Sequence, residues 1–313
     1  SGQDSGLVEI NGSTFKFKSG VSTDYEEKQS LEFTLRATDP DGFYINQTFN
    51  LNVLDDLSDN PLNLVKEDLA LKEEHYGSDL ADKMDAGDLL SNLKLHGGKG
   101  NDELLGGKGH DELHGGDDND ILEGKEGNDT LIGGLGDDTL IGGKGIDTLV
   151  FGDLDTTVNL GWRYYNKVQD TGHGNDTIDT LLIENITSGS GNDNLVGHGG
   201  DNIFDGGSGN DVLNGQWGND TLIGGLGDDT LIGSKGSDTF KFKSEDGNDI
   251  IKDFNISEGD KIQLIKTSNE DTNITYSSQG NNTVISWKDL SITVNNVQDQ
   301  DQIAQQIEWM AIS

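Results

Sequence analysis

Apolar side chains recur once in every nine residues through the middle of this chain. In residues 97–150 the apolar position is always leucine, and in residues 188–241 it is leucine or phenylalanine. These positions are Leu104, Leu113, Leu122, Leu131, Leu140, Leu149, Leu195, Phe204, Leu213, Leu222, Leu231 and Phe240. One apolar residue per nine, always in the same phase, predicts the inner row of an all-β solenoid.

The other positions of each unit predict a turn followed by a very short strand. In the clearest copy, residues 133–141, the unit reads Gly-Gly-Leu-Gly-Asp-Asp-Thr-Leu-Ile. Glycine reaches positive φ at little steric cost, so the first six positions form a turn. The last three positions, with the apolar residue in the middle, suit a short strand. Two units then make one coil, with a strand on each side and a turn at each edge.

The sixth position of the unit carries the candidate chemistry. Units two apart stack at the strand spacing of ~4.8 Å, which places Asp102, Asp120 and Asp138 along one edge and the alternate units along the other. At that spacing two carboxylates repel by roughly 3–4 kcal/mol at an effective dielectric of about 20, so the stack needs a cation. Oxygen ligands in a flexible turn suit calcium better than magnesium. The predicted calcium ligands of the solenoid are Asp102, Asp111, Asp120, Asp129, Asp138, Asp147, Asp176, Asp193, Asn202, Asp211, Asp220, Asp229, Asp238 and Asp249.

The nine-residue unit resembles the G-G-x-G-x-D-x-U-x repeat of RTX (repeats-in-toxin) proteins, which form parallel β-rolls and leave the cell by type I secretion. The resemblance covers about half of the chain and implies a β-roll over residues 97–254, interrupted at residues 151–187. It also implies calcium ions between consecutive turns of one edge, held by two aspartates and by carbonyls of the first four repeat positions. Asp118 stands at a glycine position, and Asn202 should weaken the calcium sites that it borders.

The composition also indicates a fold that depends on a cation. The 313 residues carry a net charge of −37 and are 31% hydrophobic, values typical of disordered chains unless the carboxylates are neutralised. At ~1 mM calcium and site constants of ~10–100 µM, each ion would add roughly 1.4–2.7 kcal/mol to stability. The same charge argues against nucleic acid and anionic membranes as partners. The chain has no cysteine, so we expect bound calcium to stabilise the fold in the way that disulfides stabilise many secreted proteins. The sequence also has no apolar run long enough for membrane insertion.

Residues 1–56 differ from the repeats and predict part of a β-sandwich. Residues 31–36 and 48–53 alternate apolar and polar side chains, and each segment predicts a strand. The motifs around Glu26, Asp39 and Asp41 resemble the second half of a cadherin-like repeat, in which these residues would be calcium ligands. Because half of that domain is absent and the chain opens without a signal peptide, we interpret the sequence as a piece of a longer polypeptide.

Two further segments predict caps for the ends of the solenoid. Residues 57–96 predict a linker and an N-terminal cap with short helices, one of them over residues 65–75. Residues 255–313 predict a C-terminal cap that ends in an amphipathic helix, with Ile303, Ile307 and Met310 at helical spacing. This tail resembles an uncleaved type I secretion signal, although a plain terminal helix that packs on the roll fits the pattern nearly as well.

The interruption contains an aromatic cluster with two interpretations. Trp162, Tyr164 and Tyr165 follow a strand-like stretch at residues 155–160. The cluster could form a platform on which a sugar stacks, but such clusters more often cover the side of a solenoid.

No catalytic constellation is present in the sequence. His110 and His114 suggest a zinc protease at first, but glutamate does not follow the first histidine and both residues fall in β units rather than on a helix. The prediction is therefore a non-enzymatic, calcium-dependent adhesion module of a secreted or bacterial cell-surface protein, with the type I secretion machinery and neighbouring domains of the same adhesin as partners. The alternative is the export and folding tail of a toxin or enzyme whose catalytic domain lies upstream.

Overall fold

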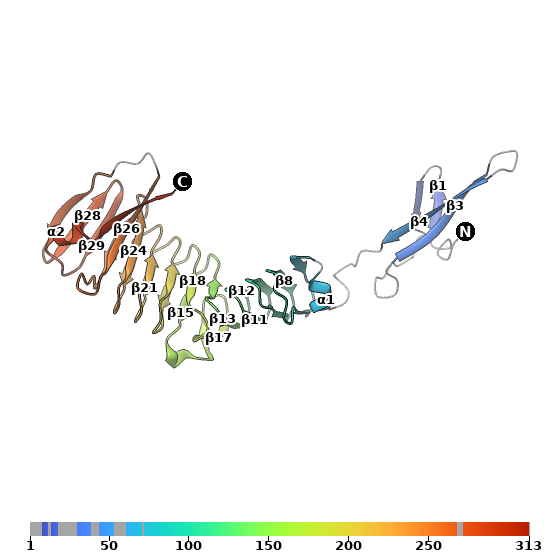
Figure 1. Cartoon of the computed structure of the whole chain (residues 1–313), viewed down its shortest axis with the longest axis horizontal. Helices are drawn as coiled ribbons and strands as arrows, with labels where there is room; N and C mark the ends of the chain where they lie inside the picture. Colours follow the sequence, from blue (N-terminus) through green and yellow to red (C-terminus); the bar gives the residue numbers. More distant parts are fainter. Residues whose placement is uncertain are drawn as a thin grey trace. The chain divides into compact units, whose positions relative to one another are not determined.

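The computed structural model describes residues 61–70, 72–267 and 272–312, and in residues 1–60 it describes only the backbone of four strands. The chain divides into two compact units, Ser1–Asp59 and Asn60–Ser313 (Figure 1). The first unit contains two antiparallel pairs, which are β1 (Val8–Asn11) with β2 (Thr14–Phe17) and β3 (Ser30–Thr38) with β4 (Tyr44–Asn52). The expected ligands Glu26, Asp39 and Asp41 lie outside the described residues.

The second unit is a β-solenoid built from three sheets. A long sheet of eleven strands contains β6 (Glu74–Tyr76), β8 (Lys94–Lys99), β10 (Glu112–Asp117), β12 (Thr130–Leu135), β14 (Thr148–Val150), β18 (Asn185–Thr187), β20 (Ile203–Asp205), β22 (Thr221–Ile223), β24 (Thr239–Lys243), β26 (Lys261–Thr267) and β30 (Ile307–Ile312). An N-terminal short sheet contains β5 (Asn63–Val65), β7 (Lys83–Asp85), β9 (Glu103–Leu105), β11 (Ile121–Glu126), β13 (Thr139–Lys144), β17 (Asn175–Ile178) and β16 (Lys167–Asp170). A C-terminal short sheet contains β15 (Thr157–Asn159), β19 (Asn194–Val196), β21 (Val212–Asn214), β23 (Thr230–Ile232), β25 (Asn248–Ile251), β29 (Leu290–Val294), β28 (Asn282–Trp287) and β27 (Thr275–Gln279).

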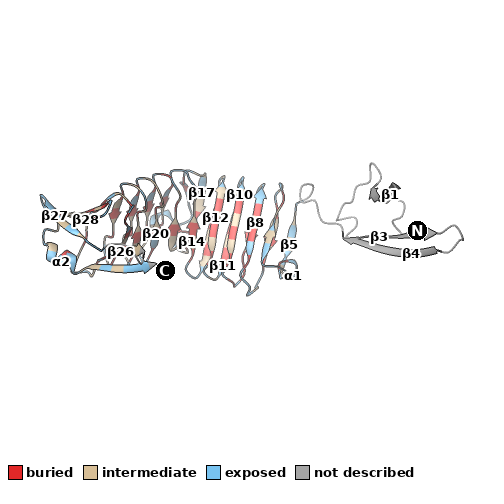
Figure 2. Ribbon diagram, turned by 90° about the horizontal axis from the view of Figure 1, so that it is seen from above, coloured by how far each residue is buried: buried red, intermediate tan, exposed pale blue. Residues whose placement is uncertain are grey.

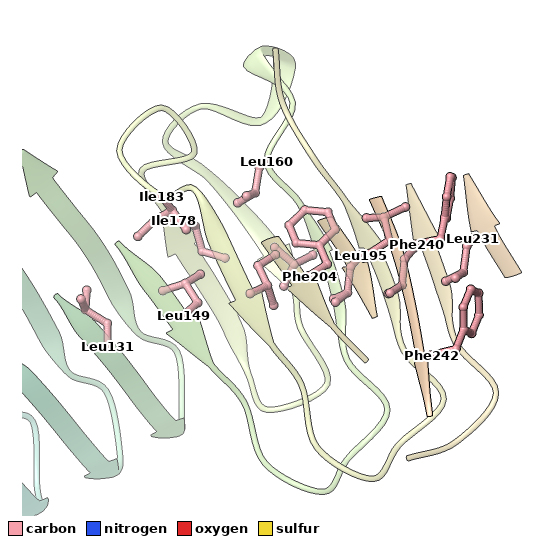
Figure 3. Packing of buried hydrophobic residues seen from close by; sticks show 14 of the residues in the cluster. Leu131, Leu149, Leu160, Ile178, Ile183, Leu195, Phe204, Leu231, Phe240 and Phe242 are labelled. Atoms are coloured by element: carbon pink, nitrogen blue, oxygen red, sulfur yellow. The ribbon is translucent and has the colours of Figure 1, made fainter. Parts of the chain in front are cut away.

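The register of the strands follows the sequence repeat. Within each array, strands two units apart pair in parallel with an offset of eighteen residues, as Leu113 does with Leu131. The apolar residue of every unit therefore stacks on the same residue of the next coil. All twelve of these side chains are at most 1% exposed, and Figure 3 shows Leu131, Leu149, Leu195 and Phe204 along the interior. In Figure 2 the buried positions form stripes across β8, β10 and β12.

Hydrogen bonds between the position-five residues of stacked turns support the edges of the roll. The backbone N–H of Asn119 donates to Asn101 Oδ1 at 3.1 Å, and the N–H of Asp137 donates to Asn119 Oδ1 at 2.8 Å. The same contact recurs in the second array, where the Asp228 N–H donates to Asn210 Oδ1 at 2.9 Å. Position five is rich in Asn and Asp because a short side-chain acceptor satisfies a turn N–H that has no strand partner.

The interruption at residues 151–187 breaks only one side of the solenoid. The long sheet continues across it, because β14 pairs directly with β18 and Leu149 lies beside Ile186. On the other side, the N-terminal short sheet ends with the antiparallel pair β17 and β16, and the C-terminal short sheet begins with β15. Between β15 and β16 lies a single 3-10 turn, η1 (Trp162–Tyr164).

The predictions for the two caps need correction. The helix expected over residues 65–75 is only α1 (Lys66–Leu69), and the rest of the segment adds coils to the roll through β6 and β7. At the C-terminus, α2 (Gln300–Ala304) is followed by β30, which pairs in parallel with β26. In both places an open sheet edge offers backbone hydrogen bonds to the chain, and this overrides the local helical pattern.

Candidate metal centre

The acidic side chains form three rows, one along each sheet. In every row the backbone N–H of one acidic residue donates to a side-chain oxygen of the residue one coil further along, at 2.7–3.0 Å. The row before the N-terminal short sheet contains Asp82, Asp102, Asp120, Asp138 and Asp176. The row before the long sheet contains Asp111, Asp129, Asp147 and Glu184, then Asn202, Asp220, Asp238 and Asp260. The row before the C-terminal short sheet contains Asp193, Asp211, Asp229 and Asp249.

One oxygen of most of these carboxylates is buried and has no hydrogen-bond partner among the residues that the structure describes. Buried polar atoms in proteins are nearly always satisfied, so repeated exceptions point to a missing group. The unpartnered atoms are the Oδ2 atoms of Asp102, Asp120, Asp129, Asp147, Asp193, Asp211, Asp220, Asp229, Asp238 and Asp249.

Backbone carbonyls share the space around these oxygens. A Cβ added to Gly115 would lie 2.3 Å from Asp120 Oδ2 and 2.5 Å from the carbonyl oxygen of Gly133, one coil further along. The same two kinds of oxygen surround Gly124, where Asp129 Oδ2 and the Gly142 carbonyl would lie 2.3 and 2.5 Å from a Cβ. Carboxylate and carbonyl oxygens are the ligands that calcium prefers, so these residues fit a calcium ion.

These carbonyls are needed to complete a coordination shell. Among the described residues no three His, Cys, Asp or Glu side chains form a cluster that could hold a metal. A site would therefore combine carboxylates from neighbouring coils with backbone oxygens, in agreement with the ligand set that the repeat implies.

At three predicted ligand positions the side chain already has protein partners. Asp111 Oδ2 accepts from the Gly107 N–H at 2.7 Å, and Asp176 Oδ2 accepts from Thr171 Oγ1 at 2.5 Å. Asn202 Oδ1, which takes the place of an aspartate Oδ2 beside Gly197, accepts from the His198 N–H at 3.0 Å. These contacts use groups that would otherwise face an ion, and we expect weaker calcium binding beside all three residues.

Three members of the rows were missed by the sequence analysis, namely Asp82, Glu184 and Asp260. Each precedes an x-apolar-x strand in the correct phase, as in Asp260-Lys261-Ile262-Gln263, but lacks the glycine-rich half of the unit. A search for acid-x-apolar-x alone would have found them. Asp82 and Asp260 extend the rows into the segments that had been assigned to the two caps.

Burial changes the proton affinity of the rows when no ion is bound. Desolvation, with smaller contributions from neighbouring carboxylates, raises the pKa of Asp120 to about 7 and that of Asp249 to about 8. Desolvation likewise raises the pKa of Asp229 to about 6. A buried carboxylate without a cation is more stable when it is protonated.

This shift predicts an acid-induced gain of structure in the calcium-free chain. Because the pKa values of the row carboxyls are higher in the folded chain than in the unfolded chain, the folded chain binds more protons between about pH 4 and pH 7. Folding without calcium should therefore become more favourable as the pH falls through that window. Far-UV circular dichroism in a chelator should show more β structure at about pH 5 than at pH 7. An unchanged spectrum would contradict the burial of the rows.

A match to a protein-family model supports the same interpretation. The family of RTX calcium-binding nonapeptide repeats matches four segments, at residues 94–122, 114–149, 183–213 and 214–251. A solved structure, the extracellular lipase LipA of Serratia marcescens, aligns over 72% of this chain with 20% identity and a TM-score of 0.31. The alignment covers only 44% of the lipase chain. No curated protein sequence matches the chain.

The matched segments coincide with the coils that carry the rows. RTX repeats are calcium-binding motifs, so several calcium ions are the cofactors of this chain, and proteins that contain these repeats are secreted. In the described part of the chain no helix is long and apolar enough to cross a membrane. Residues 94–149 and 183–251 are thus RTX calcium-binding nonapeptide repeats, and these repeats form a parallel β-roll.

Proposed function

We propose that residues 97–254 fold on calcium binding after type I secretion, and that the chain is a structural module of a bacterial surface adhesin. The observation that carries the proposal is the set of ten buried Oδ2 atoms without a partner. In a cytosol poor in calcium, repulsion within the rows would keep the chain unfolded and able to pass through a narrow channel. Outside the cell, bound ions would remove that repulsion and favour the roll.

The adhesin half of the proposal rests on the first unit. The antiparallel pair of β3 and β4 coincides with the two strands predicted in the cadherin-like segment. Tandem domains of that type build extended surface proteins, and a calcium-dependent roll would stiffen one end of such a protein. Residues 255–313 would then form the C-terminal cap and the secretion signal.

An export assay tests the proposal. Replacement of Asp129, Asp138, Asp220 and Asp229 by Ala together should lower the secreted fraction several-fold, because the chain could no longer fold on the far side. The control replaces four exposed acids outside the rows by Ala and so removes the same charge. These control residues are Asp79, Asp153, Glu245 and Asp289.

Equal export of the two quadruple variants would refute the calcium-gated mechanism. The same assay separates the two biological roles, because the parent chain can be measured on the cell surface and in the medium. Retention on the surface supports the adhesin. Complete release supports the export and folding tail of a toxin or enzyme.

A further inference from the structure

A cavity lies where the interruption meets the second array of repeats. It has a volume of about 550 Å³, within the range of roughly 300–1,000 Å³ that is typical of small-molecule sites. Two tryptophans line it, Trp162 from η1 and Trp217 from a turn of the roll. These two residues are 74% and 62% exposed, whereas the other two tryptophans of the chain, Trp287 and Trp309, pack against each other.

The backbone fixes both tryptophans at the cavity. The Trp217 N–H donates to the His198 carbonyl at 3.2 Å within the stacked turns. Just before η1, the Leu160 N–H donates to the Val196 carbonyl at 2.8 Å, so the inserted segment leaves the roll beside Gly197. The two indoles therefore come from separate elements that are anchored on adjacent coils.

The rest of the cavity wall is open backbone and polar side chains. Gly199 has no heavy atom within 4 Å of the place where a Cβ would lie, so nothing fills the space above it. The His198 ring is held by its Nδ1, which accepts from the Gly200 N–H at 2.9 Å. The Nε2 atom then carries the ring proton and faces another donor, Asn202 Nδ2, at 3.4 Å, so its N–H has no acceptor there. The side-chain amide of Gln216 lines the cavity and has no hydrogen-bond partner among the described residues. The wall thus offers flat apolar surfaces together with free donors and acceptors.

Charge limits the class of ligand. The net charge of −37 disfavours anions, including the phosphates of nucleotides. A cationic ligand would be repelled by cations of the chain that already lie over the indoles, because Arg163 lies 5.4 Å from the Trp162 ring centre and Lys235 lies 5.1 Å from that of Trp217. What remains is a neutral molecule with a flat apolar face and several hydroxyl groups.

We propose that this cavity binds a pyranose unit of a neutral saccharide, with its C–H face against Trp162 and Trp217 and its hydroxyls on His198 and Gln216. A pyranose combines an apolar face with a rim of donors and acceptors, and both match the wall. A proline-rich peptide would also stack on the indoles, but proline has no backbone N–H and gives no donor to the side-chain oxygen of Gln216. The site is independent of export and adhesion and needs only the folded roll.

Titration calorimetry of the calcium-loaded chain with cellohexaose, maltohexaose and hexa-N-acetylchitohexaose tests the proposal. At least one of these sugars should bind, and Trp162→Ala or Trp217→Ala should each weaken binding about tenfold or more. Tyr165→Ala is the matched control, because Tyr165 is exposed on the same segment but does not line the cavity. It should leave the affinity unchanged.

A second variant separates loss of the site from loss of the fold. Gly199→Leu should fill the cavity and abolish binding, and its circular dichroism in calcium should match that of the parent chain. Absence of binding by all three sugars at about 10 mM would overturn the proposal. So would binding that survives both tryptophan substitutions, or binding of choline, hexagalacturonate or a proline-rich peptide in place of the sugars.

Discussion

Removal of calcium should convert most of the β structure of this chain to disordered coil, and millimolar calcium should restore it cooperatively. In the described part of the chain, ten buried carboxylate oxygens have no partner without an ion. Adjacent coils bring these carboxylates to about 4.8 Å, where each pair repels by roughly 3–4 kcal/mol. The leucine row supplies only one apolar side chain per nine residues, which is too little to oppose the repulsion along the whole roll.

Far-UV circular dichroism during a calcium titration after chelation measures this transition. Magnesium at the same concentration is the control, because it requires near-octahedral geometry at about 2.0–2.1 Å and gives up its water reluctantly. We expect little recovery with magnesium. A β spectrum that persists in excess chelator at neutral pH would show that the rows are tolerated without an ion, and the proposed function would lose its mechanism.

A single methyl group at Gly227 should produce the second large effect. Gly227 has φ +136°, a conformation that is essentially restricted to glycine, and an added Cβ would lie 1.7 Å from the Gly209 carbonyl oxygen in the preceding coil. The backbone cannot move aside easily, because the Gly227 N–H donates to the Asp246 carbonyl at 2.7 Å. We expect Gly227→Ala to lower the free energy of unfolding of the calcium-loaded chain by about 3 kcal/mol or more.

Gly199→Ala is the matched control for this substitution. It makes the same chemical change at another glycine of the same array, but nothing lies within 4 Å of the new methyl group. Its unfolding free energy should stay within about 0.5 kcal/mol of that of the parent chain. Denaturant unfolding in saturating calcium measures both variants. Equal stability of the two would mean that the coils are not stacked as closely as the structure indicates.

The nine-residue repeat alone predicts most of the acidic rows that make up the candidate site. The spacing of nine by itself predicts that Asp102, Asp120 and Asp138 lie in one row, and the hydrogen bonds from each backbone N–H to the next carboxylate follow that order. Such a prediction succeeds because each unit contacts mainly the units two positions away, so local sequence determines local geometry. Whether these side chains ligate calcium remains a prediction that the titration tests.

The same reasoning failed where the glycines were missing. Glu184 completes a row from a segment without a recognisable turn, and its side chain accepts from the Asp147 N–H at 2.8 Å. Residues 307–312 follow a helical pattern but form β30, because Leu264 and its neighbours in β26 offer an unpaired strand edge. Local pattern cannot predict which chain segment will occupy such an edge.

The sequence alone determined the solenoid, its inner row of leucines and its acidic edges, since all three depend on contacts between units at a constant separation. Only the tertiary structure decided how the interruption leaves the roll, which strands close its ends, and that Trp162 lies at the same cavity as Trp217. These features depend on contacts between segments that share no repeat. The free energy of such contacts depends on the folded surface that each segment meets, and the periodicity of the chain carries no information about that surface.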